Sequence, residues 1–112
     1  MKKQIQVLGE TLTIAFNLAV QIAYEDITDA PFNVANLDKR KNMLALYFAA
    51  IISNNPETSI TIDRLMQDAT LDDIQALDSA IGECMQAWFK LSMQKEEKTE
   101  GKGKPTKRSR AV

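Results

Sequence analysis

The chain of 112 residues contains no histidine and a single cysteine, Cys84. Histidine is the side chain most often used for proton transfer near neutral pH, and it is the commonest metal ligand. Its absence removes every catalytic triad built on histidine. One cysteine cannot form an internal disulfide, which suits a reducing cytosol. Because Cys84 lies among Ile81, Met85 and Trp88, we expect a buried and inert thiol.

Glycine is also scarce, and its four positions match neither a phosphate-binding loop nor a dinucleotide fingerprint. The remaining route to catalysis or metal binding is a carboxylate site. The candidate residues are Glu25, Asp26, Asp29, Asp72 and Asp73. Each of these carboxylates is also explained by solvation or capping of a helix end. The sequence therefore predicts a protein that is not an enzyme and that has no catalytic, cofactor-binding or metal-binding residues.

Long apolar runs are absent as well. The longest nearly apolar run, from Met43 to Ile52, has ten residues, whereas a membrane-spanning helix needs about 20. Lys2 and Lys3 are followed by polar residues, so no signal-peptide core forms. We therefore predict a cytoplasmic protein with no membrane partner.

Charge is divided unevenly along the chain. Residues 95–112 contain seven basic and three acidic side chains, a net charge of +4, whereas residues 1–94 contain seven basic and twelve acidic ones, a net charge of −5. Lys and Glu are the commonest residues of 95–112, and Gly, Thr, Ser and Pro make up much of the rest, a composition typical of disorder. The sequence predicts one domain over residues 1–94 and a disordered basic tail over residues 95–112.

The first sixteen residues alternate between apolar and polar side chains. Ile5 and Val7 precede a turn at Leu8-Gly9-Glu10, and Leu12 and Ile14 follow it. Alternation with a period of two around a glycine-containing turn predicts a β-hairpin with one apolar face. A lone hairpin is marginally stable, so we expect this face to pack on helices.

A first helix should begin after Asn17, a capping residue, and end before Pro31. Its predicted apolar stripe contains Leu18, Ile22 and Ile27. Asp38 is expected to cap a second and mostly buried helix, which ends near Ser53.

Three cations occupy the first turn of that second helix: Lys39, Arg40 and Lys41. They oppose the positive end of the helix dipole. This unfavourable placement suggests that they contact an acidic surface elsewhere.

Two further helices complete the prediction of a mainly α fold, in which the hairpin packs on a small bundle of about four helices. Thr61 should begin a short helix over residues 62–68, and Thr70 with Asp73 should cap a long one over residues 71–94. The long helix has a heptad seam, formed by Ile74, Leu77, Ile81, Cys84, Trp88 and Leu91. This spacing favours packing along another helix, either within the chain or in a coiled coil.

The end of the first helix carries a recognisable pattern. The residues are Glu25, Asp26, Ile27, Thr28, Asp29, Pro31 and Phe32. A later apolar helix stops at Asn54-Asn55-Pro56. With the hairpin before it, this order resembles the small tail assembly chaperones of long-tailed bacteriophages and prophages, with Asp29 where glycine is common. The resemblance covers residues 1–94.

That resemblance implies a chaperone that binds and solubilises the helix-rich tape measure protein during tail morphogenesis and is absent from the mature virion. In many such systems a frameshifted extension recruits the tail tube protein, which makes that protein a possible second partner. Self-association is a further possibility for so small a domain.

The predicted partner-binding residues lie on the last helix: Met85, Trp88, Phe89 and Met93. They project around much of its circumference, so the helix must be enclosed or offer a surface to a partner. Enclosure in the core is the alternative. Because Trp88 falls in the heptad seam, we expect Phe89 to be the more exposed of the two adjacent rings.

Two other function classes stay open. The body could be a dimerising helical module whose basic tail contacts nucleic acid, although the tail has no aromatic residue to stack on bases and the acidic body would repel a duplex. The protein could also be a structural component of a phage head or tail.

Overall fold

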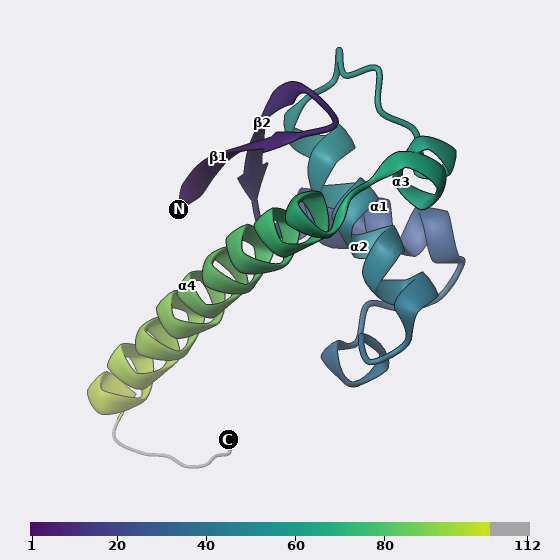
Figure 1. Cartoon of the computed structure of the whole chain (residues 1–112). Coiled ribbons are helices and arrows are strands. Elements are labelled where there is room, and N and C mark those ends of the chain that lie inside the picture. The colour runs from purple at the N-terminus through teal and green to yellow at the C-terminus, as the bar shows by residue number, and fades with distance from the viewer. Residues whose placement is uncertain (104–112) are drawn as a thin grey trace.

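A computed structural model describes the backbone of residues 1–103 and the side chains of residues 1–91. Figure 1 shows an N-terminal hairpin beside the first half of a long C-terminal helix, with the other helices on one side of both. The elements are β1 (Lys2–Val7), β2 (Glu10–Ala15), α1 (Leu18–Thr28), the 3-10 helix η1 (Val34–Asn36), α2 (Arg40–Asn54), α3 (Ile62–Asp68) and α4 (Leu71–Gly103). The predicted mainly α fold with an N-terminal hairpin and about four helices is confirmed.

The hairpin pairs β1 and β2 antiparallel, with Ile5 opposite Leu12. Its turn consists of Leu8 and Gly9, which both have positive φ values, 51° and 81°. Two-residue turns of this hand match the twist of the strands that they join. The predicted apolar face is buried at Val7, Leu12 and Ile14. Glu10, which we placed in the turn, begins β2 instead.

Helix α1 begins where the sequence predicts, because the side chain of Asn17 accepts a hydrogen bond from the N–H of Val20 at 3.2 Å. The predicted stripe is wrong at Leu18 and Ile22, whereas Ile27 is partly buried against the core. Val20 and Tyr24 face the core, whereas Leu18 and Ile22 are 63% and 58% exposed. Only two residues separate β2 from α1, so the hairpin sets the rotation of the helix, and a second apolar stripe in α1 turns inward.

Helix α1 ends at Asp29, which adopts the left-handed conformation with φ 56° and ψ 38°. Its N–H donates to the carbonyl of Glu25 at 2.7 Å. An αL residue after the last turn is a common helix stop, and aspartate is one of the few residues other than glycine that tolerates it.

Helix α2 is the central helix, as predicted: its buried residues include Leu46, Tyr47 and Ile51. Its predicted cap is wrong. Lys39 occupies the N-cap position, and within the described residues its side chain makes no capping hydrogen bond. The η1 turn displaces the helix start. The side chain of Asn42 donates to the carbonyl of Asn36 at 2.9 Å and holds this turn against α2.

The side chain of Asn55, just after α2, pairs with the outer edge of β2. Its Oδ1 accepts from the N–H of Thr13 at 2.9 Å, and its Nδ2 donates to the Thr13 carbonyl at 2.8 Å. Nδ2 also lies 2.8 Å from the carbonyl of Ile51. One amide thus satisfies edge groups of β2 that would otherwise lack a partner in the hairpin.

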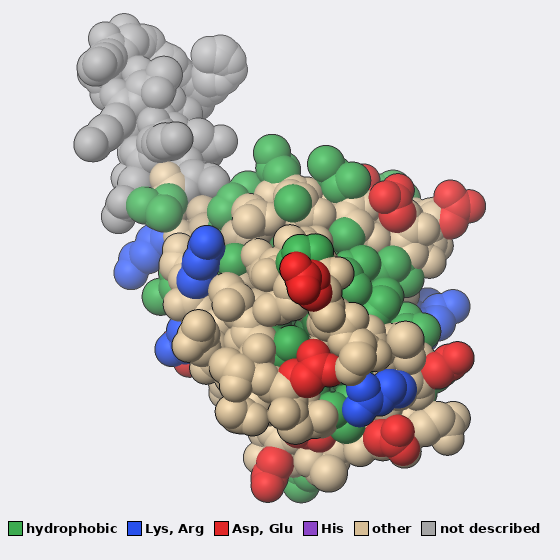
Figure 2. Space-filling model, turned by 90° about the horizontal axis from the view of Figure 1, so that it is seen from above, with side chains coloured by type: hydrophobic (Ala, Val, Ile, Leu, Met, Phe, Trp, Pro, Cys, Tyr) green, Lys and Arg blue, Asp and Glu red, His purple; other side chains and the backbone are tan. Residues whose placement is uncertain are grey.

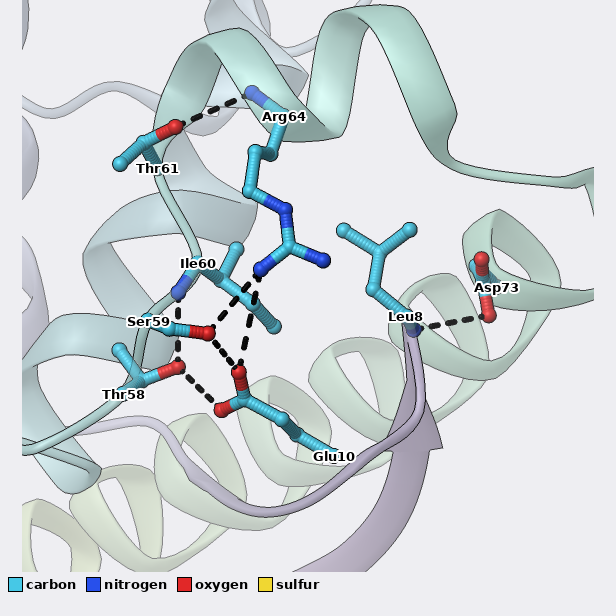
Figure 3. Close-up of polar contacts among 8 residues, drawn as sticks. All are labelled: Leu8, Glu10, Thr58, Ser59, Ile60, Thr61, Arg64 and Asp73. Atoms are coloured by element: carbon cyan, nitrogen blue, oxygen red, sulfur yellow. Dashed lines mark hydrogen bonds and ion pairs between the residues drawn. The ribbon is translucent and has the colours of Figure 1, made fainter.

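Both predicted caps of α3 and α4 are confirmed. The hydroxyl of Thr61 accepts from the N–H of Arg64 at 3.1 Å. The Thr70 hydroxyl accepts a hydrogen bond from the N–H of Asp73 at 3.2 Å, and the Asp73 carboxylate accepts one from the N–H of Thr70 at 3.0 Å. This reciprocal pair is a capping box with aspartate in place of glutamate. The second carboxylate oxygen of Asp73 accepts from the N–H of Leu8 at 3.4 Å, so this cap also contacts the hairpin turn (Figure 3).

The seam of α4 is buried at Leu77, Ile81 and Cys84, but Leu91 at its end is 60% exposed. The partner of the seam is mainly the hairpin rather than another long helix, so that expectation was wrong. A heptad pattern defines a narrow apolar stripe and does not say what covers it. Cys84 is the buried thiol that we expected, and burial raises its pKa.

The end of α4 lies further along the chain than the end that the sequence predicts. The helix continues to Gly103, beyond the predicted end at Gln94. Lys and Glu dominate residues 95–100, and both favour helix, whereas one glycine costs only about 1 kcal/mol. The remainder of the tail for which we predicted disorder, residues 104–112, lies outside the described part.

Candidate functional site

An aromatic cluster joins the hairpin exit to α4. Phe16, in the link between β2 and α1, is the hub: its ring centroid lies 5.6 Å from those of Phe32 and Trp88 and 6.0 Å from that of Phe89. Tyr24 extends the cluster through a T-shaped contact with Phe32 at 5.3 Å. Tilted and edge-on pairs at these distances are favourable beyond the area that they bury.

Trp88 and Phe89 occupy different places in this cluster. Their rings meet edge to face at 5.1 Å. Trp88 packs against the buried core, whereas Phe89 is 38% exposed. Phe89 is the more exposed of the two rings, as the heptad spacing predicts, because Trp88 lies in the seam and Phe89 does not. Their predicted role in partner binding stays a prediction.

The two methionines predicted to bind a partner lie on the same helix. Met85 is partly buried against the core. The side chain of Met93 lies outside the described residues. The aromatic face of α4, as we name it, therefore consists of Met85, Trp88 and Phe89 in the described part of the chain.

A second apolar surface was missed by the sequence reasoning. It is a cavity of about 660 Å³ between the start of α2, α3 and the start of α4. We call it the α2–α4 groove. Its lining residues are Leu37, Asp38, Lys39, Arg40, Lys41, Met43, Leu44, Tyr47, Met66, Leu71 and Ile74. The one signal in the sequence was the run of three cations, for which we expected an acidic contact.

Tyr47 lines this groove, and its hydroxyl donates to Asp78 Oδ1 at 2.8 Å, which connects α2 with α4. Burial and the neighbouring Asp78 carboxylate both raise the pKa of Tyr47, so the phenol stays protonated. The groove wall is therefore neutral at this position.

A polar cluster connects the hairpin to the segment before α3 (Figure 3). The carboxylate of Glu10 accepts hydrogen bonds from the hydroxyls of Thr58, at 2.7 Å, and Ser59. Arg64 lies 4.0 Å from Glu10 and donates to the Ser59 hydroxyl at 3.0 Å. The hydrogen bonds from Ser59 and Thr58, with Arg64 adding a smaller attraction, lower the pKa of Glu10. Every member of the cluster bonds to another, which fits a structural connection.

Replacing Glu10 by glutamine should reduce the acid sensitivity of the fold. Because the folded-state pKa of Glu10 lies below the unfolded value of about 4.3, its carboxylate stabilises the fold above that value, and the contribution is lost as the pH falls through the folded-state pKa. The urea midpoint of the Glu10→Gln variant should therefore change less between pH 7 and pH 3 than that of the wild type.

Glu57→Gln is the matched control, since Glu57 is an exposed carboxylate on the same segment. It removes one carboxylate from this segment and leaves the Glu10 cluster intact. An identical pH profile for wild type and Glu10→Gln would show that the Glu10 cluster does not couple protonation to folding.

The acidic residues considered as a carboxylate site belong to two separate places, the end of α1 and the start of α4. Glu25 Oε2 accepts from the N–H of Phe32 at 2.9 Å, and Asp73 caps α4. In the described residues no three acidic or cysteine side chains are grouped so that they could bind a metal ion. Across the same residues, no helix combines the length and the apolar character needed to cross a membrane.

Comparisons of the chain with protein families, with curated proteins and with solved structures find no match.

Proposed function

We propose that this protein is a tail assembly chaperone of a long-tailed bacteriophage or prophage. It binds the tape measure protein in the cytoplasm of the bacterial host, keeps it soluble during tail morphogenesis, and is absent from the mature virion. The protein acts by binding and carries out no catalysis. Its sequence pattern from Glu25 to Phe32 supports this assignment, because it resembles that of such chaperones.

The observation that carries the proposal is the exposure of Phe89 on the aromatic face of α4. The centroid of this ring lies 6.0 Å from that of the buried Phe16 ring, which holds Phe89 in place, while 38% of the Phe89 residue surface is exposed to solvent. Rigid aromatic side chains at the edge of a packed cluster are favoured anchors for partners. Helix α4 runs past the body of the molecule (Figure 1), and the Phe89 ring is 38% exposed, so this ring is open to an elongated partner.

The mechanism is masking of apolar helices. An unassembled tape measure protein exposes long apolar helical faces, which aggregate. A small protein that offers a helical surface can cover such a face, as amphipathic helices are bound in other systems. When many copies sit side by side on one long target, each contact can be weak and the assembly still stable.

The nucleic-acid class gains no support from the described residues. The excess of positive charge lies in residues 95–112, whereas residues 1–94 carry a net charge of −5. A duplex that approaches the body would meet this negative charge.

Co-expression with the tape measure protein of the same phage tests the proposal. Wild type should raise the soluble fraction of the tape measure protein. Phe89→Ser should bind it about tenfold more weakly, as expected when an aromatic anchor is lost. The free energy of unfolding of Phe89→Ser should fall by no more than about 1 kcal/mol, since Phe89 lies at the surface.

Val34→Ser is the control, because Val34 is a 49% exposed apolar residue that belongs to η1 and not to α4. It should leave solubilisation unchanged. Equal amounts of soluble complex with wild type and Phe89→Ser would show that the aromatic face of α4 is not the binding surface. No gain in solubility with wild type would refute the chaperone assignment itself.

A further inference from the structure

The segment that follows α1 brings Phe32 back against that helix. Asp29 adopts the left-handed backbone conformation, with φ 56°, which turns the chain at the end of α1. The ring of Phe32 then meets the ring of Tyr24, on α1, edge to face, with 5.3 Å between the two centroids. Its centroid also lies 5.6 Å from that of Phe16. The place of Phe32 in the aromatic cluster therefore depends on how this short segment is held.

Within the described part of the chain, two hydrogen bonds connect residues 30–32 to α1. The Thr28 hydroxyl reaches the carbonyl of Ala30 at 3.3 Å, and Glu25 Oε2 accepts from the N–H of Phe32 at 2.9 Å. Pro31, between them, has no N–H to donate. The bond to Glu25 is the shorter, and its acceptor is charged, which makes it the stronger of the two.

The ring of Phe16 connects Phe32 to Phe89. Phe16 is buried, and its ring meets three others, those of Phe32, Trp88 and Phe89. In a close-packed cluster, the position of one ring limits the space that is open to the next. A shift of Phe32 would therefore change the space around Phe16, and through Phe16 the position of Phe89.

Exposure alone does not distinguish Phe89 from other apolar side chains. Leu18, Leu71 and Leu91 are all more exposed than Phe89, and Figure 2 shows hydrophobic side chains reaching the surface at several separate places on one face. What Phe89 has besides exposure is the support of the Phe16 ring. A side chain that is already ordered loses less conformational entropy when it binds, so this support should strengthen binding.

We propose that Glu25 is a positioning residue for Phe89. By accepting from the N–H of Phe32, its carboxylate keeps the Phe32 ring against Phe16, and Phe16 keeps Phe89 in the orientation that a partner meets. Glu25 acts through these rings and not by touching the partner. The consequence for affinity rests on the proposed function, whereas the order of the Phe89 ring is a property of the free protein.

Nuclear magnetic resonance of the free, full-length protein tests the positioning. The ring protons of Phe16 and Phe89 should give nuclear Overhauser cross-peaks in the wild type, because the two rings are in contact. These cross-peaks should weaken in Glu25→Ala, which loses the acceptor for Phe32. The variant should stay folded, since Glu25 is exposed and alanine favours helix.

Asp26→Ala is the matched control for this measurement. Asp26 is the adjacent carboxylate on α1 and is also exposed. The change removes the same charge and leaves the hydrogen bond between Glu25 and Phe32 in place. Its cross-peaks between Phe16 and Phe89 should match those of the wild type.

Affinity for the tape measure protein is the second readout. Glu25→Ala should bind roughly threefold to tenfold more weakly, since the Phe89 ring must then be ordered on binding. Glu25→Gln should bind within about twofold of the wild type, because its amide oxygen still accepts from the N–H of Phe32. In a Phe89→Ser background, Glu25→Ala should cause no further loss, because the ring that it positions is gone.

Four results would overturn the positioning role. The first is unchanged cross-peaks in Glu25→Ala, and the second is an equal weakening of them in Asp26→Ala. The third is an equal loss of affinity in Glu25→Ala and Glu25→Gln, which would indicate a direct charge contact with the partner. The fourth is a loss of affinity from Glu25→Ala that persists at full size in the Phe89→Ser background.

Failure of the proposed function would look different. A wild type that does not bind the tape measure protein refutes the chaperone assignment. Weakened cross-peaks in Glu25→Ala alone would still establish that the carboxylate holds Phe89 in place.

Discussion

Replacing Trp88 by alanine should lower the free energy of unfolding by about 3 kcal/mol. The indole packs against the buried core and meets Phe16 at 5.6 Å and Phe89 at 5.1 Å, both edge to face. Alanine would remove these contacts and open a cavity between α4 and the hairpin exit. A large aromatic truncated in a core costs about 3–5 kcal/mol, and we take the low end because Trp88 is only partly buried.

Chemical denaturation at pH 7 measures this loss, and Phe89→Ser on the same helix is the comparison. The two adjacent positions should differ by about 2 kcal/mol or more, because Phe89 has solvent on one side. Equal losses for the two variants would mean that the tryptophan does not anchor α4, and the division of roles within the aromatic face would have to be abandoned.

Replacing Asn55 by alanine should also have a large effect: the free energy of unfolding should fall by about 2–3 kcal/mol. The change removes three hydrogen bonds: two to Thr13 and one to the carbonyl of Ile51. It also leaves the N–H and carbonyl of Thr13 without their partner. A partly buried polar group that loses its partner costs more than the hydrogen bond itself contributed.

The adjacent Asn54→Ala variant provides the control. Its side chain makes one hydrogen bond, to the carbonyl of Ala50 at 2.7 Å, within the same helix. It should cost no more than about 1 kcal/mol. Hydrogen exchange provides a local measurement, since the amide of Thr13 should exchange faster in Asn55→Ala and at the wild-type rate in Asn54→Ala. Unchanged exchange at Thr13 in both variants would argue against pairing between Asn55 and β2.

Local rules were reliable where neighbouring residues decide the structure. The caps at Asn17, Thr61 and Thr70 are formed by residues within three positions of the groups that they bond. The hairpin also follows from adjacent residues, because alternation and a glycine turn suffice. The relative exposure of Trp88 and Phe89 followed from heptad spacing alone.

Three of the wrong predictions, for α1, α4 and the start of α2, share one cause: the sequence of each segment is compatible with two different arrangements. Helix α1 contains two apolar stripes at helical spacing, and the pattern alone does not say which one faces the core. Leu91 continues the heptad seam of α4, yet nothing in the described body reaches far enough to cover it. Asp38 is a good capping residue, but the η1 turn moves the start of α2 beyond it. In each case the buried face or the helix start was determined by a segment distant in sequence or by a turn without a strong sequence signature.

The sequence by itself determined the element types, the hairpin, most helix starts, the buried thiol and the exposed ring of Phe89, because these depend on periodicity and on neighbouring residues. Only the tertiary structure decided which face of α1 is free, what covers the seam of α4, and that residues from α3, α4 and the start of α2, three cations among them, line one groove. Those features depend on how rigid elements pack against one another. Packing is set by the summed shape of many side chains from separate segments, and no local pattern carries that information.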